Sequence, residues 1–225
     1  MKYVFESINL KTSKIDKQFQ FYAEKMGFPV LDKTERSFSV ACGKTNLIFE
    51  EYEKNALYHF AFNIPENQIN ESLEWARQFS EILPFEGNKV VDFKNWNAHS
   101  CYFMDEAGNI LEFIARHNLN NASKRAFNTD SILEISEIGI VSADLNEFHE
   151  LAGGELNYSI FSGSSDRFYA LGNENALLIC VPPERAWMPT DNVISKFWPL
   201  EIIFKNEHDE KKKLIFKEDR YRFIE

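Results

Sequence analysis

The sequence repeats one pattern of secondary structure three times, and this repeat restricts the fold more than any other feature. The opening strands of the three copies superpose as Ser7-Ile8-Asn9-Leu10, His59-Phe60-Ala61-Phe62 and Glu137-Ile138-Gly139-Ile140. Each begins with a polar residue and has apolar residues one and three positions later, a period of two that is typical of a strand. Such repeats are duplicated units that bury a sheet face only together.

The first two copies each predict the order βαβββ. Apolar residues at helical spacing, such as Ile15, Phe19 and Tyr22, indicate the helix of the first copy, and Pro65 opens the helix of the second. In the first copy we expect a strand at 3–11, a helix at 14–26 and strands at 29–32, 37–42 and 46–52. In the second we expect a strand at 57–64, a helix that ends before Pro84, and strands at 89–93, 100–104 and 110–115.

The third copy begins at Ile132 and is less regular. We expect a strand at 135–142, a short helix at 145–151 that ends at Gly153-Gly154, and strands at 158–162, 167–171 and 177–181. After Pro182-Pro183 only two further strands are expected, at 200–204 and 213–216. The polar, asparagine-rich stretch 117–131 reads as a linker. These boundaries predict a complete two-module domain at 1–116, a linker at 117–131 and an additional, degenerate half-domain at 132–225.

Composition limits the class of protein. The chain of 225 residues can bury a substantial core, and its 21 phenylalanines suit one between sheets and helices. A formal net charge of −10 argues against nucleic acid and anionic membranes as partners. We expect a cytoplasmic protein, because Lys2 and Glu6 interrupt any apolar signal region and no apolar run is long enough for a bilayer. Cys42, Cys101 and Cys180 are far apart and read as reduced core residues.

The stretch 99–116, HSCYFMDEAGNILEFIAR, predicts a hairpin with an acidic residue inside its apolar second strand. Gly108 or Asn109 supplies the positive φ that a tight turn requires. Glu112 then lies among apolar neighbours, where a carboxylate is unfavourable unless it is paired, hydrogen-bonded or bound to a cation. The alternative is that Glu112 faces solvent on a half-exposed sheet.

Paired βαβββ modules that close with a D-x-x-G-N-x-x-E strand, here Asp105 to Glu112, resemble the vicinal oxygen chelate superfamily. Its members include glyoxalase I, type I extradiol dioxygenases, and fosfomycin- and bleomycin-resistance proteins. The resemblance covers 1–116 and implies an α+β fold of tandem βαβββ modules forming an open curled mixed sheet, plus an additional degenerate module. For 1–116 we expect one mostly antiparallel sheet with both helices outside, and the third module packed against it. Motifs of hydrolases and nucleotide-binding proteins are absent.

The resemblance assigns metal ligands by position. His59 leads the opening strand of the second module, where the superfamily has a metal histidine. Glu112 ends the run Gly108-Asn109-Ile110-Leu111-Glu112 in the closing strand of that module, where the superfamily has a metal carboxylate. In the first module the corresponding positions hold Ser7, where many members have a second histidine, and Phe49, or Glu50 if the alignment shifts by one.

Two ligands hold a borderline divalent metal weakly, so a third donor is expected. The choices are Ser7 as a weak neutral donor, Glu50, Glu51, His99, or the substrate itself. The ion would be Fe, Mn, Zn or Ni, and no other cofactor is implied. The extradiol signature is incomplete, because Glu106 replaces its proline.

Four residues are candidates for contact with a substrate. Ser100 and Tyr102 share the strand face that lines the ligand pocket in fosfomycin-resistance relatives, although ordinary strand packing is the alternative. Trp96 precedes this strand and would rim the pocket, whereas His99 has the opposite parity and would need a bulge. Glu137 occupies the ligand position of the third module, but no partner is expected opposite it, so it reads as a surface or hydrogen-bonded residue.

Two functions follow. In the first, the protein is a metal-dependent lyase or dioxygenase of the vicinal oxygen chelate type, in which His59 and Glu112 hold an ion that polarises a small substrate and Glu112 is catalytic. In the second, it is a non-catalytic, drug-sequestering protein that binds a small molecule without metal. The missing ligands favour the second, and the retention of both His59 and Glu112 favours the first. The sequence leaves open whether the protein forms a homodimer.

Overall fold

The three predicted copies are present in the computed structural model, which describes residues 2–164, 167–217 and 220–224. The first copy consists of β1 (Tyr3–Thr12), α1 (Ile15–Phe19) continued by a π-helical segment (Gln20–Lys25), β2 (Val30–Lys33), β3 (Ser37–Cys42) and β4 (Thr45–Glu51). The second consists of β5 (His59–Ile64), α2 (Ile69–Ala76), β6 (Ile82–Leu83), β7 (Val91–Phe93), β8 (Ala98–Met104) and β9 (Ile110–Arg116).

The third copy contains β10 (Glu134–Val141), α3 (Leu145–Leu156), β11 (Ile160–Ser164), β12 (Phe168–Asn173) and β13 (Ala176–Val181). The chain closes with β14 (Leu200–Asn206), β15 (Lys211–Lys217) and β16 (Arg220–Ile224). Helix α3 passes through Gly153-Gly154 and ends at Asn157, which takes the left-handed conformation with φ +55°, so the expected glycine stop is wrong. The sequence also did not predict the short strands β6 and β16.

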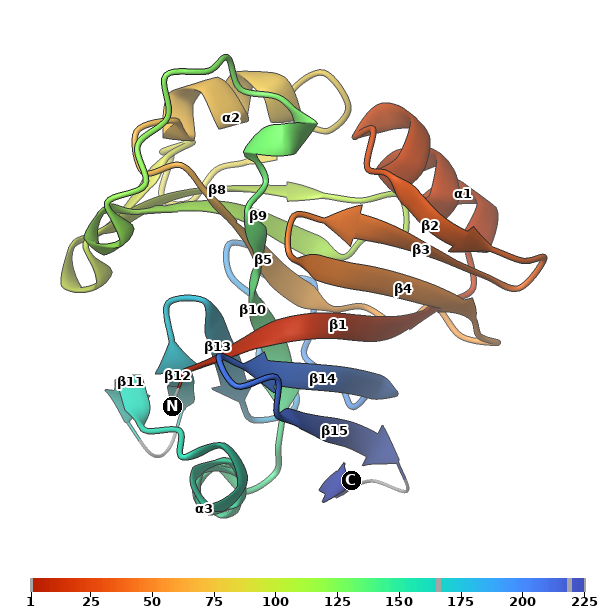
Figure 1. The fold of residues 1–225 in the computed structure, drawn as a ribbon, viewed down its shortest axis with the longest axis vertical. Helices are drawn as coiled ribbons and strands as arrows, with labels where there is room; N and C mark the ends of the chain where they lie inside the picture. The colour runs from red at the N-terminus through yellow and green to blue at the C-terminus, as the bar shows by residue number, and fades with distance from the viewer. Residues whose placement is uncertain (1, 165–166, 218–219, 225) are drawn as a thin grey trace.

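The strands form two mixed sheets (Figure 1). Sheet 1 has the order β16-β15-β14-β1-β4-β3-β2, and sheet 2 has the order β11-β12-β13-β10-β5-β9-β8-β6, with β7 beside β8. The first copy therefore shares a sheet with the C-terminal strands, through the antiparallel pair β1–β14. The second copy shares a sheet with the third, through the antiparallel pair β5–β10.

This pairing corrects one expectation. The α+β fold of tandem βαβββ modules is confirmed, but 1–116 does not form one sheet, because β1 and β5 lie in different sheets. An opening strand pairs with its own copy on one side only, and its other edge accepts any strand of matching pattern. The predicted domain boundaries stay a prediction, since strand pairing alone does not show which segments fold independently.

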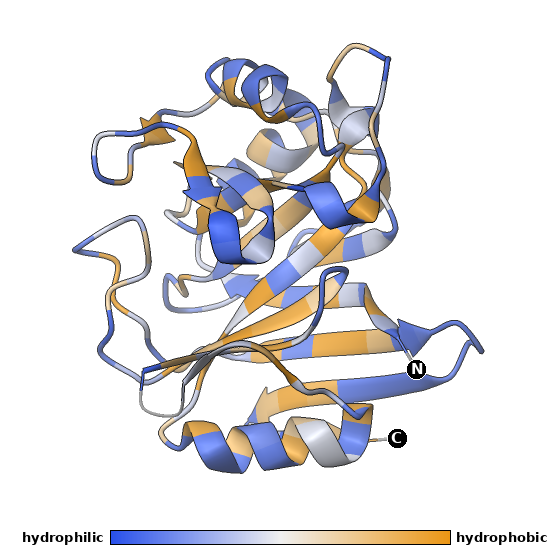
Figure 2. Cartoon of the chain, turned by 90° about the vertical axis from the view of Figure 1, so that its left-hand side faces the viewer, coloured by the Kyte–Doolittle hydropathy of each residue, from blue (hydrophilic) through white to orange (hydrophobic). Residues whose placement is uncertain are grey.

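The core lies between the helices and the inner faces of the sheets. α1 contacts β3 and β4, α2 contacts β8 and β9, and α3 contacts β12. Many of the largest buried side chains are phenylalanines, among them Phe49, Phe60 and Phe113. Figure 2 shows apolar residues concentrated along the strands, whereas turns and outer helix faces are polar. The stretch 117–131 also packs onto this core through Phe127.

The three cysteines lie in the core. Cys42, Cys101 and Cys180 are buried and free of disulfides, as expected for reduced core residues. Among the described residues, no helix has the length and apolarity needed to cross a bilayer.

Candidate metal centre and ligand cavity

The register of sheet 2 brings two carboxylates to opposite sides of one small residue. Ala61 on β5 pairs with Glu112 on β9 and with Glu137 on β10, so the three residues form one row across three strands. Since residues in such a row share a face, both carboxylates stand on the face of Ala61, whose methyl group leaves the space between them open. His59 precedes Ala61 by two residues and shares that face. An imidazole and two carboxylates therefore converge.

The three side chains are close enough to act together. One donor atom from each of His59, Glu112 and Glu137 lies within 4.8 Å of the other two. His59 Nε2 is 3.7 Å from Glu112 Oε2, and the three residues are only 6%, 3% and 2% exposed, respectively. His59 Nδ1 lies 3.2 Å from the carbonyl oxygen of Ile110. If Nδ1 carries the proton and donates it there, the lone pair of Nε2 faces the carboxylates.

A buried arginine stabilises one of the carboxylates. Arg116 is fully buried and donates through Nη2 to Glu137 Oε1, while its Nε donates to Asn63 Oδ1 at 3.1 Å. This bond uses one oxygen of Glu137 and leaves Oε2 for another partner. The indole of Trp96 lies over the guanidinium of Arg116, 5.5 Å from ring centroid to Cζ. Arg116 therefore fixes the orientation of Glu137 within an otherwise apolar setting.

Burial determines the protonation of these groups in the absence of a cation. Burial lowers the pKa of His59 to about 4, so this imidazole is neutral at physiological pH. Burial, and then the like charge of Glu137, raise the pKa of Glu112. Burial also raises the pKa of Glu137, although the guanidinium of Arg116 opposes that rise. Two carboxyl groups with raised pKa values beside a neutral imidazole indicate a site that would gain from a cation.

The cluster opens into a cavity of about 250 Å³ on sheet 2. Its walls are mainly aromatic and aliphatic, and the segment 182–199 supplies one side through Trp187 and Met188. The lining residues are His59, Phe93, Trp96, Tyr102, Glu112, Glu137, Phe168, Ile179, Val181, Arg185, Ala186, Trp187 and Met188. Apolar walls with a few convergent polar groups are typical of a small-molecule site.

The residues expected from sequence fall into two groups. His59 and Glu112 share one face and one cavity, and Tyr102 and Trp96 line the same cavity. Ser100 is buried on the same face of β8, and its hydroxyl lowers the pKa of Glu112, but it does not line the cavity.

The other expected residues lie elsewhere. His99 does not line the cavity, and its Nδ1 lies 2.8 Å from His117 Nε2. Ser7 lies on β1 in sheet 1 and does not line the cavity. Glu51 pairs with Arg36 on that sheet as well.

Glu137 is the residue that sequence reasoning misjudged. Its interpretation as a surface residue is wrong, because it is buried and belongs to the cluster, although its hydrogen-bonded role is correct. The signal was present, since Glu137 leads the segment Glu137-Ile138-Gly139-Ile140 as His59 leads His59-Phe60-Ala61-Phe62. What could not be predicted was that β10 would pair with β5 and so supply the missing partner.

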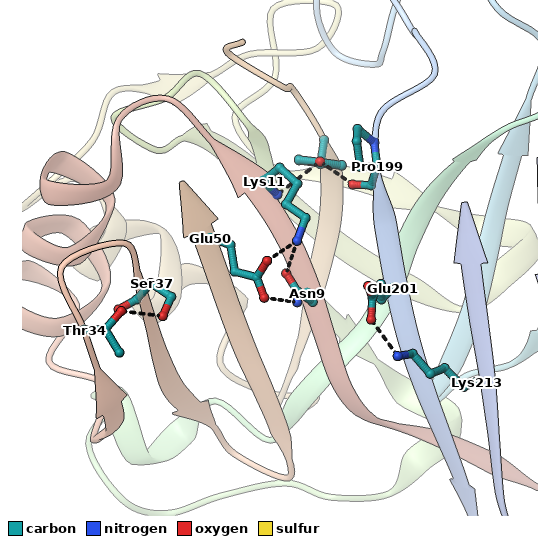
Figure 3. Close-up of polar contacts among 9 residues, drawn as sticks. Asn9, Lys11, Thr34, Ser37, Glu50, Pro199, Glu201 and Lys213 are labelled. Carbon is teal, nitrogen blue, oxygen red and sulfur yellow. Dashed lines mark hydrogen bonds and ion pairs between the residues drawn. The ribbon is translucent and has the colours of Figure 1, made fainter. Parts of the chain in front are cut away.

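Sheet 1 carries the equivalent positions but fills them with other interactions (Figure 3). Ser7 pairs with Asn46 as His59 pairs with Ile110, so the counterpart of Glu112 is Ile48, and the expected alternatives Phe49 and Glu50 are out of register. Phe49 is buried in the core, and Glu50 accepts from the side chains of Asn9 and Lys11. On the face equivalent to the cluster, the row of Asn9 is therefore followed by the Lys11–Glu50 ion pair, which lies two residues further along β1.

The donor set fits a borderline divalent metal. One imidazole and two carboxylates are common ligands of Zn, Mn, Fe and Ni, and three protein ligands leave positions for water or substrate. Ligand atoms about 2.0–2.2 Å from one ion at tetrahedral angles lie about 3.3–3.6 Å apart, so the longest separation in the cluster would have to shorten by up to about 1.5 Å. The hydrogen bond from His59 Nδ1 to a backbone carbonyl is the outer-shell arrangement that metal histidines usually have.

Comparisons with known proteins agree with this architecture at the level of the fold. No protein-family model matches the sequence, and no curated protein matches it significantly. A candidate dioxygenase from Bacillus subtilis is similar over 99% of this chain and 85% of its own, with 10% identity and a TM-score of 0.66. Glyoxalase I from Zea mays is similar over 95% of this chain and 92% of its own, with 11% identity and a TM-score of 0.55. The V278E mutant of the maize enzyme gives 11% identity and a TM-score of 0.56 over 95% of this chain and 92% of its own.

These likenesses extend over nearly the whole chain, including the third module and the C-terminal strands. Together with the tandem βαβββ modules and their two mixed sheets, they agree with the resemblance carried by Asp105 to Glu112. The chain has the fold of the vicinal oxygen chelate superfamily.

Proposed function

We propose that the cavity binds a small organic molecule beside a divalent metal ion held by His59, Glu112 and Glu137, and that the protein is a metal-dependent lyase or dioxygenase. The observation that supports this proposal is the convergence of three buried donors in one cavity. In this proposal Glu137, and not the expected Ser7, is the third metal ligand beside His59 and Glu112.

Different residues of the cavity would bind the metal ion, transfer a proton and orient the substrate. A bound ion would act as a Lewis acid on a substrate oxygen. His59 Nε2 and the carboxylates would hold it, and Arg116 would keep Glu137 in place. Glu112 would accept and return a substrate proton through the carboxylate oxygen that does not hold the ion. Tyr102 and Trp96 would orient the substrate and exclude water.

Metal analysis of the purified protein tests the proposal. Wild-type protein should bind about one equivalent of Zn²⁺ or Mn²⁺ and unfold at a higher temperature when the ion is present. Glu112→Gln and Glu137→Gln should lose both effects. Glu201→Gln is the matched control, because Glu201 pairs with Asn9 in sheet 1 as Glu137 pairs with Ala61 in sheet 2. A wild-type protein without bound metal, or a loss in Glu201→Gln as large as in Glu137→Gln, would contradict it.

The non-catalytic binding protein stays the second candidate, and one observation favours it. Arg116 already neutralises Glu137, so the cluster has a cation beside it without a metal. On this proposal, ligands would bind the metal-depleted protein as tightly as the metal-loaded one. Titration of Trp96 and Trp187 fluorescence in both states separates the two candidates.

A further inference from the structure

The exposed edge of the cavity carries positive charge that no carboxylate in the described ranges neutralises. Arg185 lines the cavity, and its pKa is lowered by partial burial and by the nearby charge of Arg167. Neither arginine forms a salt bridge within residues 2–164, 167–217 and 220–224. In a chain of net charge −10, two arginines beside one cavity that have no ion-pair partner among the described residues point to an anion as their partner.

Arg185 is held in place from both its main chain and its side chain. Its backbone N–H donates to Ser195 Oγ at 3.0 Å, and its carbonyl accepts from the Ser195 N–H at 2.7 Å. Its Nη1 donates to the carbonyl oxygen of Arg167 at 2.6 Å, and its guanidinium lies over the ring of Phe168, 5.6 Å from the centroid. This is the one hydrogen bond that the guanidinium forms with the described residues, and it orients the planar group for a two-pronged contact with a carboxylate.

The walls between Arg185 and the metal cluster select for a flat, apolar body. Phe93, Trp96, Phe168 and Trp187 present aromatic side chains to the cavity. A volume of about 250 Å³ lies near the lower end of small-molecule sites, which favours a ligand with a single ring. Rings stacked on or edge-on to indole and phenyl groups gain more than aliphatic chains of similar area.

The charges of the cavity also determine which end of a ligand lies where. Glu112 and Glu137 stand at the buried end, and Arg116 is paired with Glu137 behind them, whereas Arg185 lies at the exposed edge. At the buried end Glu137 already has Arg116 as its partner, whereas at the exposed edge Arg185 offers its positive charge to a ligand carboxylate.

We propose that the cavity takes a small aromatic carboxylate whose ring lies among Trp96, Phe168 and Trp187 and whose carboxylate is bound by Arg185. This inference deepens the proposed small-molecule function and rests on it only in assuming that this cavity is the ligand site. Arg185 is thus a specificity-determining residue, which sequence reasoning did not single out.

Binding of phenylacetate and of its neutral isostere phenylacetamide tests the inference, with the fluorescence of Trp96 and Trp187 as the readout. Wild-type protein should bind phenylacetate at least about ten-fold more tightly than phenylacetamide, because hydrogen bonds to a charged group are the stronger ones. The preference should fall as NaCl is raised, since Arg185 is exposed to solvent. Arg185→Gln should abolish the preference while leaving the affinity for phenylacetamide unchanged, and Arg185→Lys should restore part of it.

Arg36→Gln is the control, because Arg36 is an exposed arginine paired with Glu51 on sheet 1, away from the cavity. The inference is overturned if the two ligands bind equally, if neither binds, or if Arg185→Gln keeps the preference. Metal content is measured on the same preparations. Loss of carboxylate preference in Arg185→Gln without metal in any preparation would contradict the proposed metal centre alone, whereas bound metal without any preference would contradict this inference alone.

Discussion

At the residue scale, Arg116 is the most constrained side chain of the site. It is fully buried, and its charge is compensated by Glu137, with Asn63 as a further partner. A buried ion pair contributes little net stability compared with apolar residues of similar volume, but removing one partner leaves an uncompensated charge in the interior. The pair is therefore more sensitive to single than to double substitution.

We predict that Arg116→Met lowers the free energy of unfolding by about 3–5 kcal/mol at pH 7, because it leaves Glu137 buried and unpaired. The double variant Arg116→Met/Glu137→Met should regain most of this loss, since it removes both charges. Urea denaturation of the three proteins measures the effect. Arg36→Met, which breaks an exposed pair with Glu51, should change stability by less than about 1 kcal/mol. Equal destabilisation of the single and double variants would contradict the prediction.

The raised pKa of Glu112 predicts how stability depends on pH when metal has been removed. In the folded state burial raises this pKa to about 8, above the ordinary value of about 4.3. Between those values the unfolded chain binds fewer protons than the folded one, so stability falls as pH rises. His59 has the opposite effect, but its pKa is lowered to about 4, so its contribution is complete by about pH 6.5.

We therefore expect metal-free protein to lose about 2 kcal/mol of stability between about pH 6.5 and pH 8. Chemical denaturation at intervals across this range, in the presence of a chelator, measures the slope. Glu112→Gln should reduce the slope, because glutamine does not titrate and only the buried Glu137 carboxyl remains, and Glu201→Gln should leave it in place. A wild-type stability that stays level or rises over this window is the contrary result.

At the scale of elements, the segment 182–199 closes the cavity by seating one tryptophan on one glycine. Trp187 is buried, and its ring lies 5.5 Å from that of His59. A Cβ on Gly139, in the centre of β10, would come within 2.6 Å of the Trp187 ring. The absence of a side chain at Gly139 is what lets this segment lie close to sheet 2. Gly139 occupies the same place in its repeated segment as Ala61 does in His59-Phe60-Ala61-Phe62. A side chain is excluded at position 139 because Trp187, from segment 182–199, lies directly over it.

We predict that Gly139→Ala destabilises the protein by about 1–3 kcal/mol and weakens ligand binding, because Trp187 must move. Gly154→Ala is the matched control. Gly154 lies inside α3 with open space where an alanine methyl group would lie, so its alanine variant should be neutral or stabilising by up to about 1 kcal/mol. Thermal unfolding and the tryptophan emission spectrum measure both variants. An unchanged spectrum and stability in Gly139→Ala would show that Trp187 does not depend on this contact.

At the scale of the whole molecule, each sheet is assembled from distant parts of the chain. Sheet 1 joins 3–51 with 200–224, and sheet 2 joins 59–116 with 134–181. The candidate site depends on this arrangement, because Glu137 comes from one half and His59 and Glu112 come from the other.

We predict that 132–225 expressed alone shows no cooperative unfolding transition, because β10 and β14 would each lose a partner strand. Co-expression with 1–131 should restore a complex that unfolds cooperatively, with the full-length chain as reference. Circular dichroism and analytical ultracentrifugation measure both. A soluble, cooperatively folded 132–225 monomer would contradict this prediction and support the predicted division into independent domains.

Much of the architecture could be predicted because it is local. The alternation in Ser7-Ile8-Asn9-Leu10 and in its two counterparts determines which side chains face the core, and it does so whatever strand lies alongside. The turn at Gly108-Asn109 places Glu112 opposite Tyr102 on the same hairpin, so this part of the site was also accessible. The proximity of His59 to Glu112 could be predicted for a similar reason, because β5 and β9 belong to one module and pair with each other.

The rest depended on contacts between segments far apart in the chain. The sequence by itself determined three copies of a βαβββ unit, their apolar faces, and an acidic residue inside an apolar strand, because these follow from periods of two and 3.6 residues. Only the tertiary structure decided that β10 rather than β1 lies beside β5, and hence that Glu137 rather than Ser7 joins His59 and Glu112. The physical reason is that the free edge of a strand offers the same hydrogen-bonding groups to every partner, so side-chain packing over the whole molecule makes the choice.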